Sequence, residues 1–148
     1  MAQESFMDAL DGCQLPAWET LPDFGLYMDQ LLTYVERSVP KVSGILGLTP
    51  AMINNYVKLG LIDRPAGKKY SRDALAQLLM IVLLKQSLSQ ESMKQLLHPP
   101  EDPGTEALYR DFRAAQKEII RRYQSVPEVS RLTCALESAT LSLAFRLM

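Results

Sequence analysis

The chain has 148 residues, enough for one domain with a hydrophobic core or for a small domain plus a dimerisation element, and its formal net charge is −1. Its two cysteines, Cys13 and Cys134, lack any CxxC or Cys/His spacing, so the sequence indicates no disulfide framework and no zinc site, and we expect no metal and no cofactor. The N-terminus has no signal pattern and the longest apolar run, Leu78 to Leu84, is too short to span a membrane, which predicts a cytoplasmic protein with no membrane association.

The first predicted unit, residues 1–40, is an acidic arm followed by a helix. Residues 1–36 contain seven acidic side chains and no Lys or Arg. Residues 1–14 lack a capping signal, which predicts a loosely attached segment. Two prolines bracket Trp18, which predicts an extended segment that packs on a hydrophobic surface through the indole. Asp23 is suited to cap a helix over 24–38, which either fills out the core, or contacts a partner or covers the predicted DNA-reading segment.

The second predicted unit, residues 41–100, opens with a short helix over 41–46 and a turn at Gly47. Thr49 is an N-cap candidate and Pro50 stands at the first helical position, so a second helix begins there and ends before Gly60. Helical spacing predicts its buried side as Met52, Ile53, Tyr56 and Leu59. Its outer side is then Ala51, Asn54, Asn55 and Lys58.

A small wing is predicted after this helix. Leu61 and Ile62 favour a short apolar strand, and residues 64–69 favour a polar hairpin tip, after which Tyr70 returns the chain to the core. Residues 41–72 carry six basic side chains and one acidic side chain, so positive charge gathers where phosphate neutralisation would need it. The alternative is a solvated loop that happens to be basic.

Two more helices complete the second unit. Ser71 is a good N-cap for a helix over 72–86, which is apolar almost all round and is therefore predicted to be central and buried. Ser89 caps a further helix that runs to Leu97. His98 has no partner at metal-ligand spacing, so we expect a structural or inert role.

The third predicted unit, residues 101–148, is a helical hairpin behind a Pro-Gly boundary. Thr105 is the predicted cap of a helix to Gln124, and a last helix covers 128–147. The apolar stripe of the first helix is Leu108, Phe112, Ala115, Ile119 and Tyr123, and that of the second is Val129, Leu132, Leu136, Ala139, Leu143 and Leu147. The hairpin either folds back on the rest of the chain or pairs with a second copy. Additional apolar residues at Leu141, Ala144 and Phe145 favour a twofold dimer.

The segments GLTPAMINNYVKLGLI and KKYSRDALAQLLMIVLLKQSLSQESMKQLL resemble the DNA-binding domain of the MerR family over roughly residues 42–97. This resemblance implies a mainly α fold, a MerR-like winged helix-turn-helix flanked by an N-terminal helix and a C-terminal helical hairpin. Asn54-Asn55 replaces the Arg-Tyr pair of MerR proteins, and the wing is several residues shorter, so the phosphate contacts of those MerR side chains do not carry over. LPAWETLPDFGLYMDQ, NNYVKLGLIDRP and KKYS together resemble the bacterial family named domain of unknown function 1836, over nearly the whole chain.

An enzyme is not predicted, because the chain has one histidine, no glycine-rich phosphate loop and no nucleophile beside a base. We expect instead a transcription regulator that reads double-stranded DNA as a homodimer, since Asn can bind the edge of adenine in a bidentate fashion and basic side chains can contact phosphates. The candidate DNA-binding residues are Thr49, Ala51, Asn54, Asn55, Lys58, Arg64, Lys68, Lys69 and Arg72. Two alternatives stay open. One is a protein-interaction adaptor on the same scaffold, and the other is a sensor whose unknown small-molecule effector lies among Trp18, Tyr27, Met28 and Phe112.

Overall fold

The computed structural model describes residues 6–40, 47–125 and 130–148, and within these ranges it consists of seven α-helices and one 3-10 turn with no strand. The elements are α1 Phe6–Gly12, η1 Trp18–Thr20, α2 Met28–Ser38, α4 Pro50–Lys58, α5 Arg72–Leu84, α6 Gln90–Leu97, α7 Thr105–Gln124 and α8 Arg131–Leu147. The predicted mainly α class is confirmed. The helix expected over 41–46 lies outside the described residues. Of the helices that are described, none combines the length and apolar character of a membrane span.

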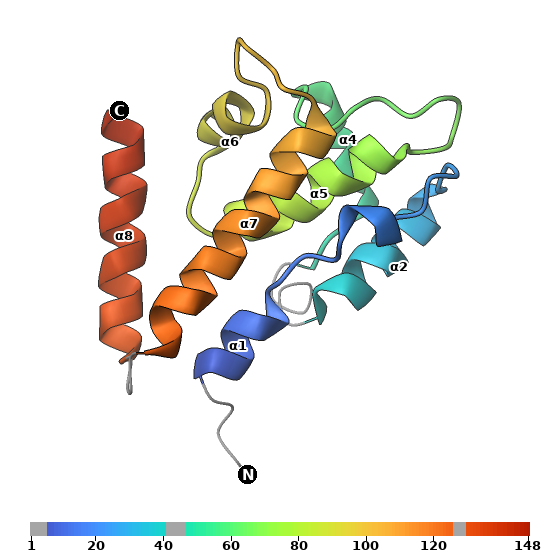
Figure 1. Cartoon of the computed structure of the whole chain (residues 1–148). Coiled ribbons are helices and arrows are strands. Elements are labelled where there is room, and N and C mark those ends of the chain that lie inside the picture. The colour runs from blue at the N-terminus through green and yellow to red at the C-terminus, as the bar shows by residue number, and fades with distance from the viewer. Residues whose placement is uncertain (1–5, 41–46, 126–129) are drawn as a thin grey trace.

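Helix α5 is the centre of the molecule. Ser71 caps it as predicted, with its Oγ accepting a hydrogen bond from the backbone N–H of Ala74 at 3.1 Å. Every residue from Ala74 to Val82 is buried. A helix that is apolar on all sides must be covered on all sides, and α2, α6 and α7 pack against it. Figure 1 shows α7 lying along α5, with α2 beside them.

The N-terminal arm is more ordered than predicted, because residues 6–12 form helix α1 against α7. The Phe6 ring meets the Tyr123 ring edge-on at 5.4 Å between centroids. Trp18 is buried as expected, 5.8 Å from the ring of Tyr109. The arm is thus attached to a helix about 100 residues later in the sequence, which is a contact that local pattern cannot indicate.

Helix α2 begins at Met28, not near Phe24, and Asp23 does not cap it. The backbone of Leu26 cannot join the helix, because its N–H and C=O form hydrogen bonds of 2.9 and 2.7 Å with the backbone of Tyr70 in an antiparallel bridge. The chain is therefore extended up to Tyr27, whose N–H donates to Gln30 Oε1 at 3.0 Å. The pairing of Leu26 with Tyr70 therefore makes α2 shorter than the helix that the apolar periodicity predicted.

The apolar stripe predicted for α7 is only partly correct, because Leu108 and Phe112 pack partly buried against the core but the stripe omits the most buried residues of the helix. Tyr109 and Ile120 are its buried residues, whereas Ala115 and Ile119 are exposed. The helix is rotated because it offers polar side chains to the backbone of the arm. Gln116 binds both the N–H of Leu15 and the carbonyl of Cys13, and Arg113 Nε donates to the carbonyl of Leu15.

The start of α7 differs from the prediction as well. Thr105 is the first helical residue and Gly104, with φ of +92°, precedes it in the capping position. The Thr105 hydroxyl accepts a hydrogen bond from the side chain of buried Gln77 at 3.0 Å instead of capping the helix. The same Gln77 holds the segment that leads into the wing, so α5 ties these two parts of the chain together.

Candidate nucleic-acid interface

Helix α4 has the orientation that its sequence predicts. Thr49 Oγ1 accepts a hydrogen bond from the N–H of Met52 at 3.3 Å, and Pro50 is the first helical residue. Ile53 and Tyr56 are buried, which turns the opposite side of the helix to solvent. The exposed residues of that side are Thr49, Ala51, Asn54, Asn55 and Lys58.

The end of α4 departs from the prediction in two ways. Leu59, expected in the core, is 36% exposed, because the chain turns at Gly60 with φ of +74° and sends Leu61 and Ile62 into the core instead. Leu61 and Ile62 do not form the predicted strand.

Side chains take the place of strand partners in this segment. The Leu61 carbonyl lies 3.1 Å from His98 Nε2, and the N–H of Asp63 donates to Gln77 Oε1 at 2.8 Å. The segment is fixed to the body at both points, and His98 has the structural role expected of it.

The segment predicted as a wing, residues 64–69, contains a minimal hairpin. Ala66 and Lys69 exchange backbone hydrogen bonds of 2.9 and 3.2 Å around Gly67, whose φ is +64°. Tyr70 is buried, and this burial raises the pKa of its phenol. The tip exposes Arg64, Lys68 and Lys69.

The wing rests on the N-terminal arm. Gly25 lies so close to it that an added Cβ would be 2.6 Å from the Cβ of Lys69, which no real Cβ contact allows. The Lys69 ammonium lies 5.4 Å from the centre of the Tyr27 ring, within cation–π range. The acidic arm thus supports the wing from one side and leaves both wing lysines exposed.

Arg72 is set apart from the other candidate residues. Its guanidinium lies 5.4 Å from the centre of the Trp18 ring and 3.6 Å from the carboxylate of Asp23, and its side chain is 29% exposed. Among the described residues, its buried Nε has no hydrogen-bond partner. Arg72 therefore anchors the arm to the start of α5, while the other candidates face solvent.

Two grooves adjoin α4. One, of about 530 Å³, brings the start of α2 together with Pro50 and the wing residues Pro65, Gly67 and Lys68, so the first turn of α4 and the wing are neighbours. Tyr27 and Met28, two of the residues expected around an effector, line this groove, whereas Trp18 and Phe112 do not. The second groove, of about 340 Å³, lies between α4 and the start of α6 and includes Asn55.

A family model described as Domain of unknown function (DUF1836) matches residues 16–112, about two thirds of the chain. The chain belongs to this family. The match runs from the arm to the first half of α7 and ends before α8, so it is shorter than the near-complete coverage expected from the sequence. No curated protein and no solved structure matches the chain. The family's description names no activity, so the function of this DUF1836 member has to be inferred from its geometry.

Two cations near α4 in this DUF1836 protein were not predicted. Lys85 Nζ lies 5.9 Å from the centre of the Tyr56 ring, and Lys94 Nζ lies 3.6 Å from the point where a Cβ at Gly60 would be. They come from the end of α5 and from α6, and they add positive charge around the second half of α4. No spacing in the sequence relates them to α4. In the described parts of the chain, no three His, Cys, Asp or Glu side chains gather as metal ligands would.

Proposed function

We propose that this protein binds duplex DNA, with α4 as a recognition helix and residues 64–70 as the wing of a MerR-like winged helix-turn-helix. The observation that supports this is the exposure of Asn54 and Asn55 side by side on the outer face of a capped helix. An α-helix fits the major groove of DNA. An Asn side chain can accept one hydrogen bond from the edge of adenine and donate another to it at the same time. Thr49 and Ala51, in and before the first turn, would approach the same groove.

Phosphate contacts would come from the basic side chains around the helix. Lys58 is exposed at the end of α4, and the wing exposes Arg64, Lys68 and Lys69. Such contacts set the register of the protein on the duplex and carry no sequence information. Arg72 has a different role in this proposal, since it holds the arm on which the wing rests.

The test is binding to mixed and genome-derived duplexes, measured by fluorescence anisotropy across a salt series. Replacing Lys68 and Lys69 by Ala is expected to weaken binding about equally for all sequences and to lower the salt slope by about one unit per lost phosphate contact. Asn54→Ala is expected to change preference at one base position, by about 1–3 kcal/mol. Lys117→Ala, on an exposed position of α7, is the matched control. Absence of binding at low salt would contradict the proposal and favour a protein-binding module.

We also propose that the protein acts as a twofold dimer through α8. Leu132, Leu136, Leu143 and Leu147, at spacings typical of one helix face, are 58–79% exposed. Full burial of a leucine contributes about 1.5–3 kcal/mol, so the four leucines of each protomer can offset an association cost of about 4–15 kcal/mol. One DNA-binding domain of this size buries too little surface for strong and specific binding. A dimer would contact two half-sites of the duplex and would bury twice that surface.

Sedimentation equilibrium tests the dimer directly. A mass of two chains is expected at micromolar protein, and Leu136→Arg together with Leu143→Arg is expected to give a single-chain mass and weaker DNA binding. Thr133→Arg together with Thr140→Arg adds the same charge at exposed positions of α8 outside the leucine stripe and is the control. A single-chain mass for the unaltered protein would remove the dimer from the proposal.

A further inference from the structure

The larger groove beside α4 has the size and lining of a small-molecule site. Its volume of about 530 Å³ lies within the range of roughly 300–1,000 Å³ that such sites occupy. Its apolar walls come from three separate parts of the chain: Met28 and Leu32 of α2, Pro50 of α4, and Pro65 and Tyr70 of the wing. The groove exists because the Leu26–Tyr70 bridge holds the wing against the start of α2.

Two groups of opposite charge line this groove from different elements. Asp29 belongs to the first turn of α2 and Lys68 to the tip of the wing. In the described parts of the chain neither side chain forms an ion pair, although both are exposed and both border the same apolar space. A carboxylate and an ammonium separated by an apolar groove are complementary to a ligand that carries both charges and an apolar body. A simple anion would face Asp29, and a simple cation would face Lys68.

We propose that this groove binds a small zwitterion with an apolar side chain, the chemical class of the hydrophobic α-amino acids. Lys68 receives the ligand's carboxylate, Asp29 receives its ammonium group, and Met28, Leu32 and Tyr70 cover the side chain. The site goes beyond the proposed DNA binding and does not depend on it. Because ion pairs at an exposed rim are weak, the expected dissociation constant is about 0.1–10 mM, typical of a metabolite sensor and not of a tightly held cofactor.

The test uses L-phenylalanine as the probe and the full chain without DNA, with methionine methyl groups labelled with ¹³C for NMR. The Met28 methyl signal is expected to shift in a saturable way, while the signal of Met80, which is buried in α5, stays in place. Phenylacetate lacks the ammonium group and phenethylamine lacks the carboxylate, and each is expected to bind at least about fivefold more weakly. L-Leucine is expected to bind, since the walls are apolar and not specific for a ring.

Charge reversal separates recognition from folding. Lys68→Asp and Asp29→Lys are each expected to weaken L-phenylalanine binding at least about fivefold, because each places two like charges at the groove. The double variant is expected to restore binding to within about twofold, since a zwitterion can enter in the reverse orientation. Glu36→Lys on α2 and Lys117→Asp on α7 are the matched controls. Thermal unfolding of every variant reports whether the fold is kept.

Three results would overturn the proposal: no saturable shift of Met28 at about 10 mM L-phenylalanine, equal binding of phenylacetate or phenethylamine, or a double variant no better than the single ones. The first result would leave the groove without a zwitterion ligand, and the second would show that only its apolar walls matter. None of these outcomes bears on DNA binding, because no DNA is present. Loss of DNA binding in the anisotropy experiment would likewise leave this site untouched.

Discussion

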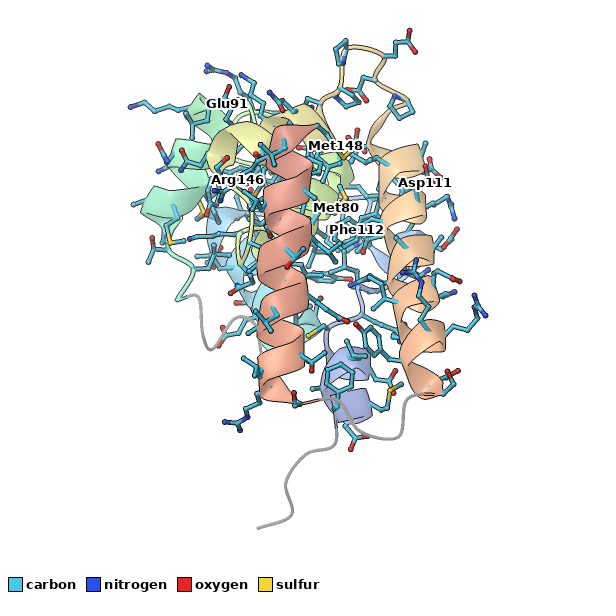
Figure 2. The ribbon with its side chains drawn as sticks, turned by 90° about the vertical axis from the view of Figure 1, so that its left-hand side faces the viewer. Met80, Glu91, Asp111, Phe112, Arg146 and Met148 are labelled. Carbon is cyan, nitrogen blue, oxygen red and sulfur yellow. The ribbon has the colours of Figure 1, made fainter. Side chains whose placement is uncertain are left out.

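Helices α7 and α8 have similar apolar stripes in the sequence, but α7 packs against the core and α8 does not. Helix α7 buries Tyr109 completely, whereas α8 has no buried residue. Figure 1 shows α8 as a rod beside α7, and in Figure 2 the labelled Arg146 and Met148 of α8 lie at the same end of the molecule as Glu91 of α6. An apolar stripe therefore predicts that a helix face should be buried, but it does not predict which surface buries that face.

Polar side chains explain why α7 stays with the body. Its inner face offers Tyr109, Arg113 and Gln116 to the carbonyl and N–H groups of the arm, which would otherwise be poorly satisfied. Helix α8 offers nothing comparable, and its one described polar link to α7 is the Tyr123–Glu137 hydrogen bond, which raises the pKa of the Tyr123 phenol. Hydrogen bonds to the arm therefore determine how α7 packs. Helix α8 lacks such bonds, so its apolar residues remain exposed and can contact another surface.

The largest expected effect is at Tyr109. Its side chain is fully buried, and its hydroxyl donates to the Pro16 carbonyl at 2.6 Å. Tyr109→Ala is expected to lower the free energy of unfolding by about 3–5 kcal/mol, because it leaves a cavity beside Trp18 as well as an unpaired carbonyl. Urea denaturation measures the change. Tyr109→Phe removes only the hydrogen bond and is expected to lower it by about 1–3 kcal/mol. A loss below about 1 kcal/mol for Tyr109→Ala would mean that α7 is not part of the core.

A smaller effect is expected at Gln116. Gln116→Ala removes two hydrogen bonds to the arm, and the partly buried N–H of Leu15 and carbonyl of Cys13 lose their partner. The free energy of unfolding is expected to fall by about 1–2 kcal/mol, and amide hydrogen exchange of Leu15 is expected to become faster. The neighbouring exposed Lys117→Ala is the control, with a change within about 0.5 kcal/mol. Unchanged exchange at Leu15 would show that the arm is held by other contacts.

The smallest effect is expected on α8. Leu136→Ala, at a site that is 58% exposed, is expected to change the free energy of unfolding by less than about 0.5 kcal/mol when measured at nanomolar protein, where dimers dissociate. Leu75→Ala in α5 removes the same atoms from a fully buried site and is expected to lower it by about 2–5 kcal/mol. A loss of more than about 2 kcal/mol in the free energy of unfolding for Leu136→Ala would show that α8 packs against its own chain, as α7 does.

Local features were predictable because the atoms that decide them lie within a few residues. A cap depends on one side chain and the backbone N–H three positions later, and Thr49, Ser71 and Ser89 each cap the helix that the sequence assigned to them. The central place of α5 followed from its composition. The outward position of Asn54 and Asn55 followed from the spacing of Ile53 and Tyr56.

Most of the errors share one cause, which is a partner far away in the sequence. The start of α2 is set by Tyr70, the shape of the Leu61–Ile62 segment by Gln77 and His98, and the inner face of α7 by the backbone of the arm. The same holds for the candidate sites, since Arg72 is held by Trp18 and Asp23, and the groove between Asp29 and Lys68 exists only where the wing meets α2.

By itself, the sequence determined that this protein is mainly helical, where α4, α5 and α6 begin, and which side of α4 faces water, since these depend on short-range hydrogen bonds and on which residues avoid water. Only the tertiary structure decided how the acidic arm and the wing lie together, which face α7 turns inward, and that α8 keeps its leucines exposed. Those outcomes depend on backbone groups that find hydrogen-bond partners across the fold, and no local periodicity records such pairs.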